Sequence, residues 1–292
     1  MIETMIESFT DAIIDTAKLI PFLYITYLIM EFIERKAADK STETLASVGR
    51  LGPIFGGIVG VIPQCGFSAS AASLYSGGIL SIGTLLAVFL STSDEMLPIF
   101  ISEHLEAGSI FRILAVKAAI GVISGLGFDF LLRFTKYKYK TEKRIHDLCE
   151  NEHCHCEDEE EGNLFLAALI HTLHIALFVF LISFALTFAI EGLGKDALAG
   201  FLTNRPVIGV LLSALIGLIP NCASSVMITQ FYLNGLLNAG QMMAGLLVGA
   251  GVGLLVLFRT NRHMRENLRI AGVLYAFGVF WGLLIELSGI AF

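Results

Sequence analysis

The sequence contains few charged residues for its length. Only 15% of its 292 residues are Asp, Glu, Lys or Arg, whereas soluble globular proteins have about 25%. Hydrophobic residues make up 55% of the chain, and the mean hydropathy is +0.76. A soluble domain of this composition would have too little polar material to cover its surface. The scarcity of charge therefore excludes an ordinary soluble protein and predicts an integral membrane protein.

Positive charge and cysteine are also scarce. A net charge of −7 and a pI near 5.5 exclude the broad basic surface that nucleic-acid binding requires. The five cysteines are an odd number, and three of them share one hydrophilic loop, which favours thiols or metal ligands over a disulfide framework. No GxxxxGK[ST] nucleotide motif occurs. The acidic start Met1–Glu7 does not match a basic signal peptide, so we expect the first apolar segment to be retained.

Long apolar runs dominate what remains. A helix needs about 20 apolar residues to cross a bilayer. Six apolar segments reach this length, namely 9–33, 79–101, 110–134, 164–190, 237–258 and 268–290. Two further segments, 52–77 and 206–235, are interrupted by Pro63 and Pro220. The positive-inside rule places the basic loops 35–50, 133–144 and 259–269 in the cytoplasm. Each proline-containing segment must then cross an even number of times, as a hairpin. We expect a multi-pass protein of the cytoplasmic (inner) membrane, with both termini outside.

The two hairpin segments are copies of one sequence. Gly60–Cys65 aligns with Gly217–Cys222 at an offset of 220 − 63 = 157 residues. The same offset pairs Tyr75 with Tyr232, Gly83 with Gly240, Arg112 with Arg269, and Asp129 with Glu286. The predicted domains are a first repeat over 1–135, a linker over 136–162 and a second repeat over 163–292. Each repeat crosses an odd number of times, so the repeats are inverted. The predicted fold is all-α, each repeat having three full transmembrane helices plus a broken-helix hairpin, about ten helices in total.

The hairpin tips are the first candidate site. Each arm of about 12 residues is about 18 Å long, or half the hydrocarbon core, so the two tips are expected near the midplane. Polar groups at the tips suit a soft or borderline metal, and the expected substrate-binding residues are Gln64, Cys65, Ser68, Asn221, Cys222 and Ser225. The alternative is that the Pro-x-Cys segments are packing kinks.

Ionisable residues inside the spans extend this candidate site. Asp94 and Glu95 are costly in a membrane helix, which favours Asp94 as a cation ligand and Glu95 as a proton carrier. The alternative is a structural partnership with Lys117 or a position at the membrane interface. His171 and His174 share a helix face and are candidate metal ligands or proton relays, or else plain interfacial residues. The metal-ligand prediction thus comprises Cys65, Asp94, Cys222, His171 and His174.

The linker has a separate metal signature. Its thiol and imidazole residues are followed by the acidic run Glu157–Glu161, and they are His146, Cys149, His153, Cys154, His155 and Cys156. These groups suit capture of a zinc-like or other thiophilic ion. The alternative is a charged linker without a metal role.

These motifs carry a resemblance to a known family. The segments Ile62–Ser68, Ser91–Glu95 and Ile219–Ser225 resemble the ten-helix heavy-metal exporter family, whose members are described as manganese transporters or arsenic efflux proteins. That family is related to the organoarsenical permeases. The resemblance covers essentially the full length, and it implies five helices per half and efflux of a metal or metalloid.

The sequence therefore predicts a secondary transporter, not an enzyme. It is expected to export a divalent transition or heavy metal, with manganese and zinc as candidates, by proton antiport and without a resident cofactor. The alternative is a permease for an organoarsenical or another small anionic or neutral metalloid species. A channel is a further possibility, but duplicated broken helices favour alternating access. The expected partners are the metal ion and the lipid bilayer, and the sequence leaves open whether the chain forms a homo-oligomer.

Overall fold

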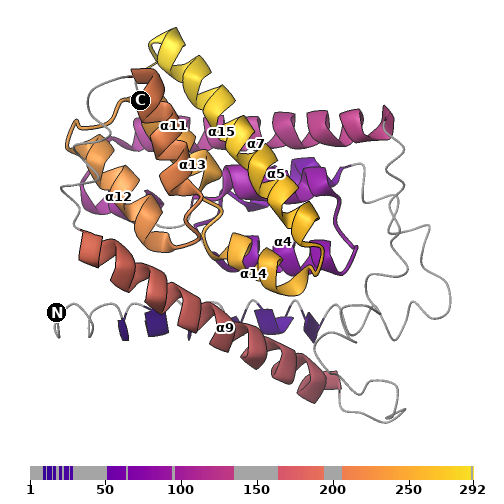
Figure 1. The fold of residues 1–292 in the computed structure, drawn as a ribbon. Helices are drawn as coiled ribbons and strands as arrows, with labels where there is room; N and C mark the ends of the chain where they lie inside the picture. Colours follow the sequence, from indigo (N-terminus) through magenta and orange to yellow (C-terminus); the bar gives the residue numbers. More distant parts are fainter. Residues whose placement is uncertain are drawn as a thin grey trace.

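The computed structural model describes parts of residues 9–28, then 51–134 apart from 64, 94 and 95, then 164–193, and 206–292 apart from 291. All regular elements of these residues are helices (Figure 1). Helices are the expected outcome for such an apolar chain, because lipid offers no partner for a backbone N–H or C=O group. The first half contains α3 (Gly52–Val59), α4 (Cys65–Ser76), α5 (Ile82–Ser91), α6 (Met96–Ser102) and α7 (Ala107–Phe134).

The second half repeats this order of elements. It begins with α9 (Leu164–Leu193), followed by α11 (Pro206–Gly217), α12 (Cys222–Leu233), α13 (Ala239–Val248), α14 (Val252–Thr260) and α15 (Met264–Ser288). Shifted by 157 residues, the bounds of α4 coincide with those of α12, and the bounds of α5 with those of α13. Both α4 and α12 end in a turn with a glycine at positive φ, Gly78 at 77° and Gly235 at 70°.

Two expected continuous spans are broken. The segment 79–101 is divided into α5 and α6, and the segment 237–258 into α13 and α14. The hairpin segments 52–77 and 206–235 are also each two short helices, as predicted. An α-helix of 7 to 12 residues is only about 10 to 18 Å long, so each of these helices reaches partway across a bilayer. None of these helices is therefore long enough to cross a bilayer alone.

The short helices of the two halves interlace. α3 packs against α5 and α7, and α11 packs against α13 and α15, so the first arm of each hairpin stays within its own half. The second arms cross over, α4 packing on α14 and α12 packing on α6. Gly253 permits the first crossing, because a Cβ at this position would lie 2.7 Å from the Cβ of Ser68. The hairpin tips are consequently held between the two halves.

The remaining long helix packs on α14 at one side of this bundle. α9 runs beside the described parts of residues 9–28 along the lower side of the molecule in Figure 1. The ring of Phe9 lies edge-on to those of Phe180 and Phe184, at 5.6 and 5.8 Å. Arg259 at the end of α14 lies 5.7 Å above the ring of Phe178, which connects α9 to the bundle.

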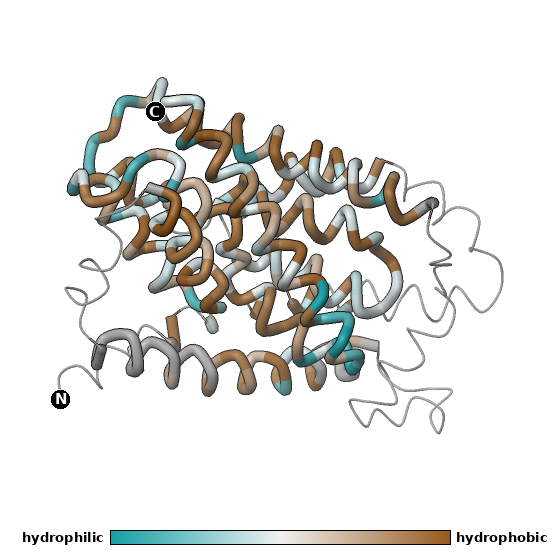
Figure 2. The backbone as a smooth tube through the Cα atoms, turned by 45° about the horizontal axis from the view of Figure 1, so that its top comes forward, coloured by the Kyte–Doolittle hydropathy of each residue, from teal (hydrophilic) through white to brown (hydrophobic). Residues whose placement is uncertain are grey.

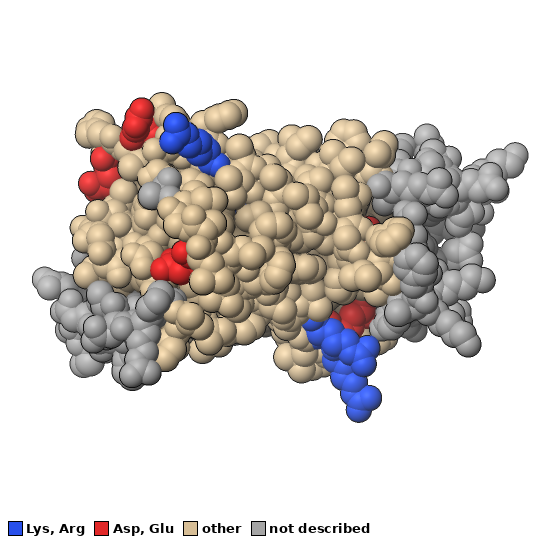
Figure 3. Space-filling view, turned by 90° about the horizontal axis from the view of Figure 1, so that it is seen from above, with Lys and Arg blue, Asp and Glu red and all other residues tan. Residues whose placement is uncertain are grey.

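The described surface is that of a membrane protein. Four helical stretches are long and apolar enough to cross a bilayer, namely Ile82–Ser102, Ala107–Leu132, Ala239–Thr260 and Met264–Ser288, the first and third including the breaks. Large apolar side chains such as Phe111 and Leu287, 73% and 81% exposed, point outward. Helix middles are mostly apolar and the polar turns lie toward the ends (Figure 2). Figure 3 shows a broad uncharged surface between charged groups near opposite ends of the molecule.

Candidate functional site

The first helix break is made by hydroxyl side chains. At the end of α5, Ser91 Oγ donates to the Ala87 carbonyl at 2.8 Å and Thr92 Oγ1 to the Val88 carbonyl at 2.7 Å. Thr92 then turns the backbone out of the helix at φ −52° and ψ 129°. Such local side-chain hydrogen bonds compete with the helical pattern. Ser93 Oγ donates to the Val61 carbonyl at 2.8 Å, which ties the break to the tip of the first hairpin.

The second break is made by glycine. α13 ends before Gly249, and α14 begins after Gly251, whose φ of 53° and ψ of −138° are strained for any residue with a Cβ. The N–H of Ala250 donates to the carbonyl of Val248 at 2.7 Å rather than to that of Leu246. The Leu246 carbonyl is therefore available to another donor at the end of the helix.

Lys117 joins the two breaks. It lies in the middle of α7 with 1% of its surface exposed, and its Nζ donates to the Leu246 carbonyl at 2.8 Å and to the Thr92 carbonyl. Among the residues that the structure describes, it is the one charged side chain that is buried. An ammonium that is removed from water needs hydrogen-bond acceptors in the protein. Backbone carbonyls at the two helix ends act as such acceptors. Sequence reasoning named Lys117 only as a partner of the carboxylates; its signal was a single basic residue inside an apolar span.

The tip of the second hairpin approaches the same place. Asn221 is 4% exposed and its Oδ1 accepts the N–H of Ala223 at 3.2 Å, which caps α12. The hydroxyls of Ser224 and Ser225 donate to the carbonyls of Asn221 and Cys222, at 2.7 and 2.8 Å. The N-terminus of α12, which carries a partial positive charge, thus lies beside the two helix breaks.

A small cavity lies where these elements meet. Its polar lining comes from both breaks, α7 and the second hairpin, and consists of Thr92, Ser93, Lys117, Asn221, Ser224 and Ser225. Two of the predicted site residues, Asn221 and Ser225, are therefore brought together with hydroxyl groups and a cation. The cavity lies between the two halves, which is where the sequence places the substrate site.

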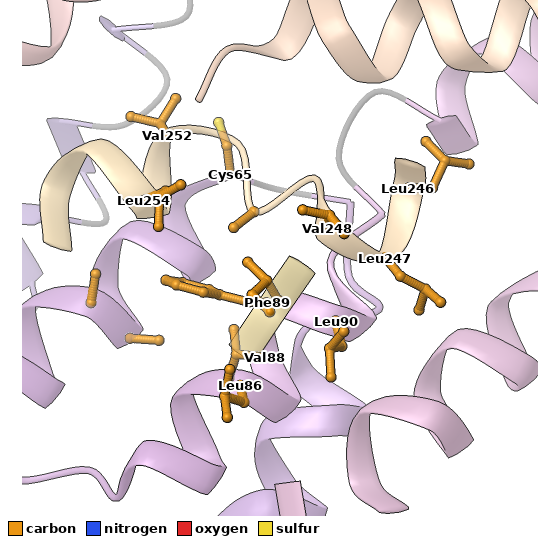
Figure 4. Close-up of a cluster of buried hydrophobic side chains, with 14 of the residues drawn as sticks. Cys65, Leu86, Val88, Phe89, Leu90, Leu246, Leu247, Val248, Val252 and Leu254 are labelled. Carbon is orange, nitrogen blue, oxygen red and sulfur yellow. The ribbon is translucent and has the colours of Figure 1, made fainter. Parts of the chain in front are cut away.

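The two thiols predicted as metal ligands have different surroundings. Cys65 and Cys222 are 5% and 6% exposed and belong to the apolar core, and neither lines the cavity. Figure 4 shows Cys65 beside Val252, among apolar side chains. Ser68 is fully buried, and its hydroxyl donates to the Cys65 carbonyl at 2.9 Å. In this conformation the cavity and the thiols are separate features.

Several predicted residues lie outside the described part of the chain. These are Gln64, Asp94, Glu95 and the linker residues His146, Cys149, His153, Cys154, His155 and Cys156. His171 belongs to α9 but its side chain is not described, whereas the His174 side chain is exposed on that helix. Among the described residues, no three His, Cys, Asp or Glu side chains form a group that could hold a metal ion.

Two carboxylates at helix ends have structural partners that the sequence did not predict. Asp129 accepts the Gly83 N–H at 2.8 Å and the Ser81 hydroxyl at 2.6 Å, at the N-terminus of α5. Glu286, its counterpart at an offset of 157 residues, accepts the side-chain amide of Asn238 at the N-terminus of α13, at 2.9 Å. Negative charge stabilises a helix N-terminus. The sequence signal for these contacts is that both carboxylates lie 46 to 48 residues after the helix starts that they cap.

The fold and composition define a multi-pass membrane protein. Residues 1–197, more than half of the chain, match a family described as "Putative, 10TM heavy-metal exporter". The chain belongs to this family, as the resemblance in its motifs indicated. The family is one of transporters and not of enzymes. No curated protein and no solved structure matches the chain.

Proposed function

We propose that this chain is a secondary transporter that exports a divalent transition or heavy-metal ion across the cytoplasmic membrane in exchange for protons. The observation that carries the proposal is the cavity formed jointly by two broken helices and a hairpin tip. Broken helices that meet near the midplane are typical of secondary transporters, whose substrate sites lie at the interface of inverted repeats. The matching bounds of α4 with α12 and of α5 with α13 support the repeat.

The cavity is the proposed substrate site. Asn221 and Ser225 offer oxygen ligands there, and we assign Asp94, which follows the cavity-lining Ser93 in the chain, as the anionic ligand. Gln64 and Ser68 are proposed to contribute from the first hairpin. Because Cys65 and Cys222 lie in the apolar core, they would bind the ion only after the hairpin tips shift.

The remaining predicted residues are assigned to the path of ions and protons. We propose that the linker thiols and histidines capture the metal in the cytoplasm, and that His171, His174 and Glu95 relay metal or protons. An exposed His174 on α9 is compatible with a role near an entrance. Alternating access then follows from rocking of one half against the other.

One observation favours a second candidate function. The described lining of the cavity contains a lysine and a helix N-terminus, both positive, and no carboxylate. Such a lining suits an organoarsenical or another small anionic or neutral metalloid species better than a bare cation. The assignment of Asp94 to the site is what separates the two candidates.

Uptake into inside-out membrane vesicles distinguishes them. The metal proposal predicts saturable uptake of one of Mn²⁺, Zn²⁺, Co²⁺ or Cd²⁺ that requires a proton gradient. Asp94→Asn should lower this uptake, whereas Glu103→Gln, a change at an exposed carboxylate, should not. Uptake of a trivalent organoarsenical alone would replace the first candidate by the second. Uptake of neither, or flux without saturation, would contradict both transporter proposals.

A further inference from the structure

The side chain of Lys117 connects the C-terminal ends of two half-helices that come from different halves of the chain. Thr92 follows the last residue of α5, and Leu246 lies in the last turn of α13. Both accept hydrogen bonds from the Lys117 ammonium through their backbone carbonyls. The bond to Thr92 joins α7 to the helix break of its own half. The bond to Leu246 reaches across to the other repeat.

Carbonyls at the end of a helix carry partial negative charge. The C-terminus of an α-helix is equivalent to about half a negative elementary charge, and two such ends meet here. In transporters with broken helices, half-helix C-termini and unwound carbonyls coordinate the coupling cation. The Lys117 ammonium has the charge of Na⁺ and binds the carbonyl oxygens of both ends.

The second half has no matching charge. The position 157 residues after Lys117 is Leu274, which is fully buried and apolar. One lysine therefore serves both helix ends.

We propose that Lys117 is a built-in cation of this site: its ammonium occupies the position between the ends of α5 and α13 where a coupling Na⁺ would bind, and transport therefore needs no sodium. This inference rests on the proposed function only in treating the adjacent cavity as the transport site. It assigns Lys117 a positioning role, because the ammonium holds the two helix ends that shape the cavity.

Chemical rescue tests the ammonium without measuring transport. Lys117→Ala removes three methylene groups and the ammonium, which together correspond to n-propylammonium. In the purified full-length chain, Lys117→Ala should unfold at a lower temperature than the wild type. Added n-propylammonium should restore several degrees to this variant and leave the wild type unchanged. Lys117→Met fills the same space without charge, so it should be destabilised and gain nothing from n-propylammonium.

Two results of the thermal comparison would contradict the proposal. Equal stabilisation of Lys117→Met and Lys117→Ala by n-propylammonium would overturn the proposal, as would wild-type stability in both variants. If Lys117→Ala cannot be purified, wild-type vesicle uptake decides: equal rates in sodium and choline media support the built-in cation, and a requirement for Na⁺ overturns it. If the wild type transports nothing, the proposed function fails while the thermal comparison still judges Lys117.

Discussion

The Asp129 carboxylate accepts the backbone N–H of Gly83 at 2.8 Å, although 46 residues separate the two in the chain. The same carboxylate accepts the hydroxyl of Ser81, which itself caps the first turn of α5. Glu286 lies at the matching place beside α13. In each half, the last long helix thus holds the start of the first half-helix of the broken pair.

Removal of this cap should destabilise the protein. Asp129→Ala leaves the Gly83 N–H and the Ser81 hydroxyl without their acceptor, at a cost of about 1.5–3 kcal/mol for hydrogen bonds to a charged group. We expect a lower unfolding temperature in detergent. Glu103→Ala, at an exposed carboxylate that follows the last residue of α6, is the matched control and should change little. Equal effects of the two changes would refute the capping role.

The crossing of α4 and α14 should depend on the absence of a side chain at Gly253. Gly253→Ala places a Cβ 2.7 Å from Ser68 Cβ and 2.9 Å from the ring of Phe89. Overpacking of this kind costs about 1–3 kcal/mol, so stability and uptake should both fall. Gly272→Ala, where no atom lies within 4 Å of the added Cβ, should be tolerated. A tolerated Gly253→Ala would show that the hairpin does not pack on α14 as described.

A polar contact closes one end of the first hairpin. The Tyr75 hydroxyl donates to Glu266 Oε1, and the hydroxyls of Ser76 and Thr260 lie 2.6 Å apart. The hydroxyl of its counterpart, Tyr232, donates to the backbone carbonyl of Phe292 at 3.3 Å, and the Tyr232 ring packs edge-on against Phe100. Tyr75→Phe removes the hydroxyl but keeps the ring, and should make the cavity more accessible from that end.

This asymmetry between the two ends can be measured by thiol labelling. A cysteine at Ser225 should react faster with an impermeant reagent applied from the Tyr75 end when Tyr75 is changed to Phe. Tyr232→Phe is the matched control and should not increase the rate from that end. An increase of the same size in both variants would mean that the Tyr75 hydroxyl does not hold this end closed.

The repeat explains how much could be predicted from the sequence. The alignment of Pro63 with Pro220 predicted both hairpins, and α4 and α12 begin at the aligned residues Cys65 and Cys222. The breaks at Thr92 and Gly249 were missed because the apolar length of each segment fits one continuous span. Hydroxyl groups that bond to the preceding turn break the first helix, and Gly251 at positive φ breaks the second, in segments that remain apolar.

The cavity between the two halves is lined by only some of the residues that the sequence predicts for the site. Asn221 and Ser225, which the sequence predicts as site residues because they follow the proline of the second hairpin, both line the cavity. Lys117 could not be placed, since its carbonyl partners exist only where two helices from different halves end together. Cys65 was expected at the site from its residue type, but neighbouring apolar side chains determine where a buried thiol lies.

The central claim is that the cavity between the broken helices holds the transported species. Its most direct test places a cysteine at Ser225, which lines the cavity, and replaces the linker residues Cys149, Cys154 and Cys156 by Ser. The same chain with Ser225 intact is the control for the buried native thiols. Impermeant thiol reagents are applied to right-side-out and inside-out vesicles, with and without the transported ion. The account predicts labelling from both sides and protection by the ion; labelling that the ion leaves unchanged, or that occurs from one side alone, would contradict it.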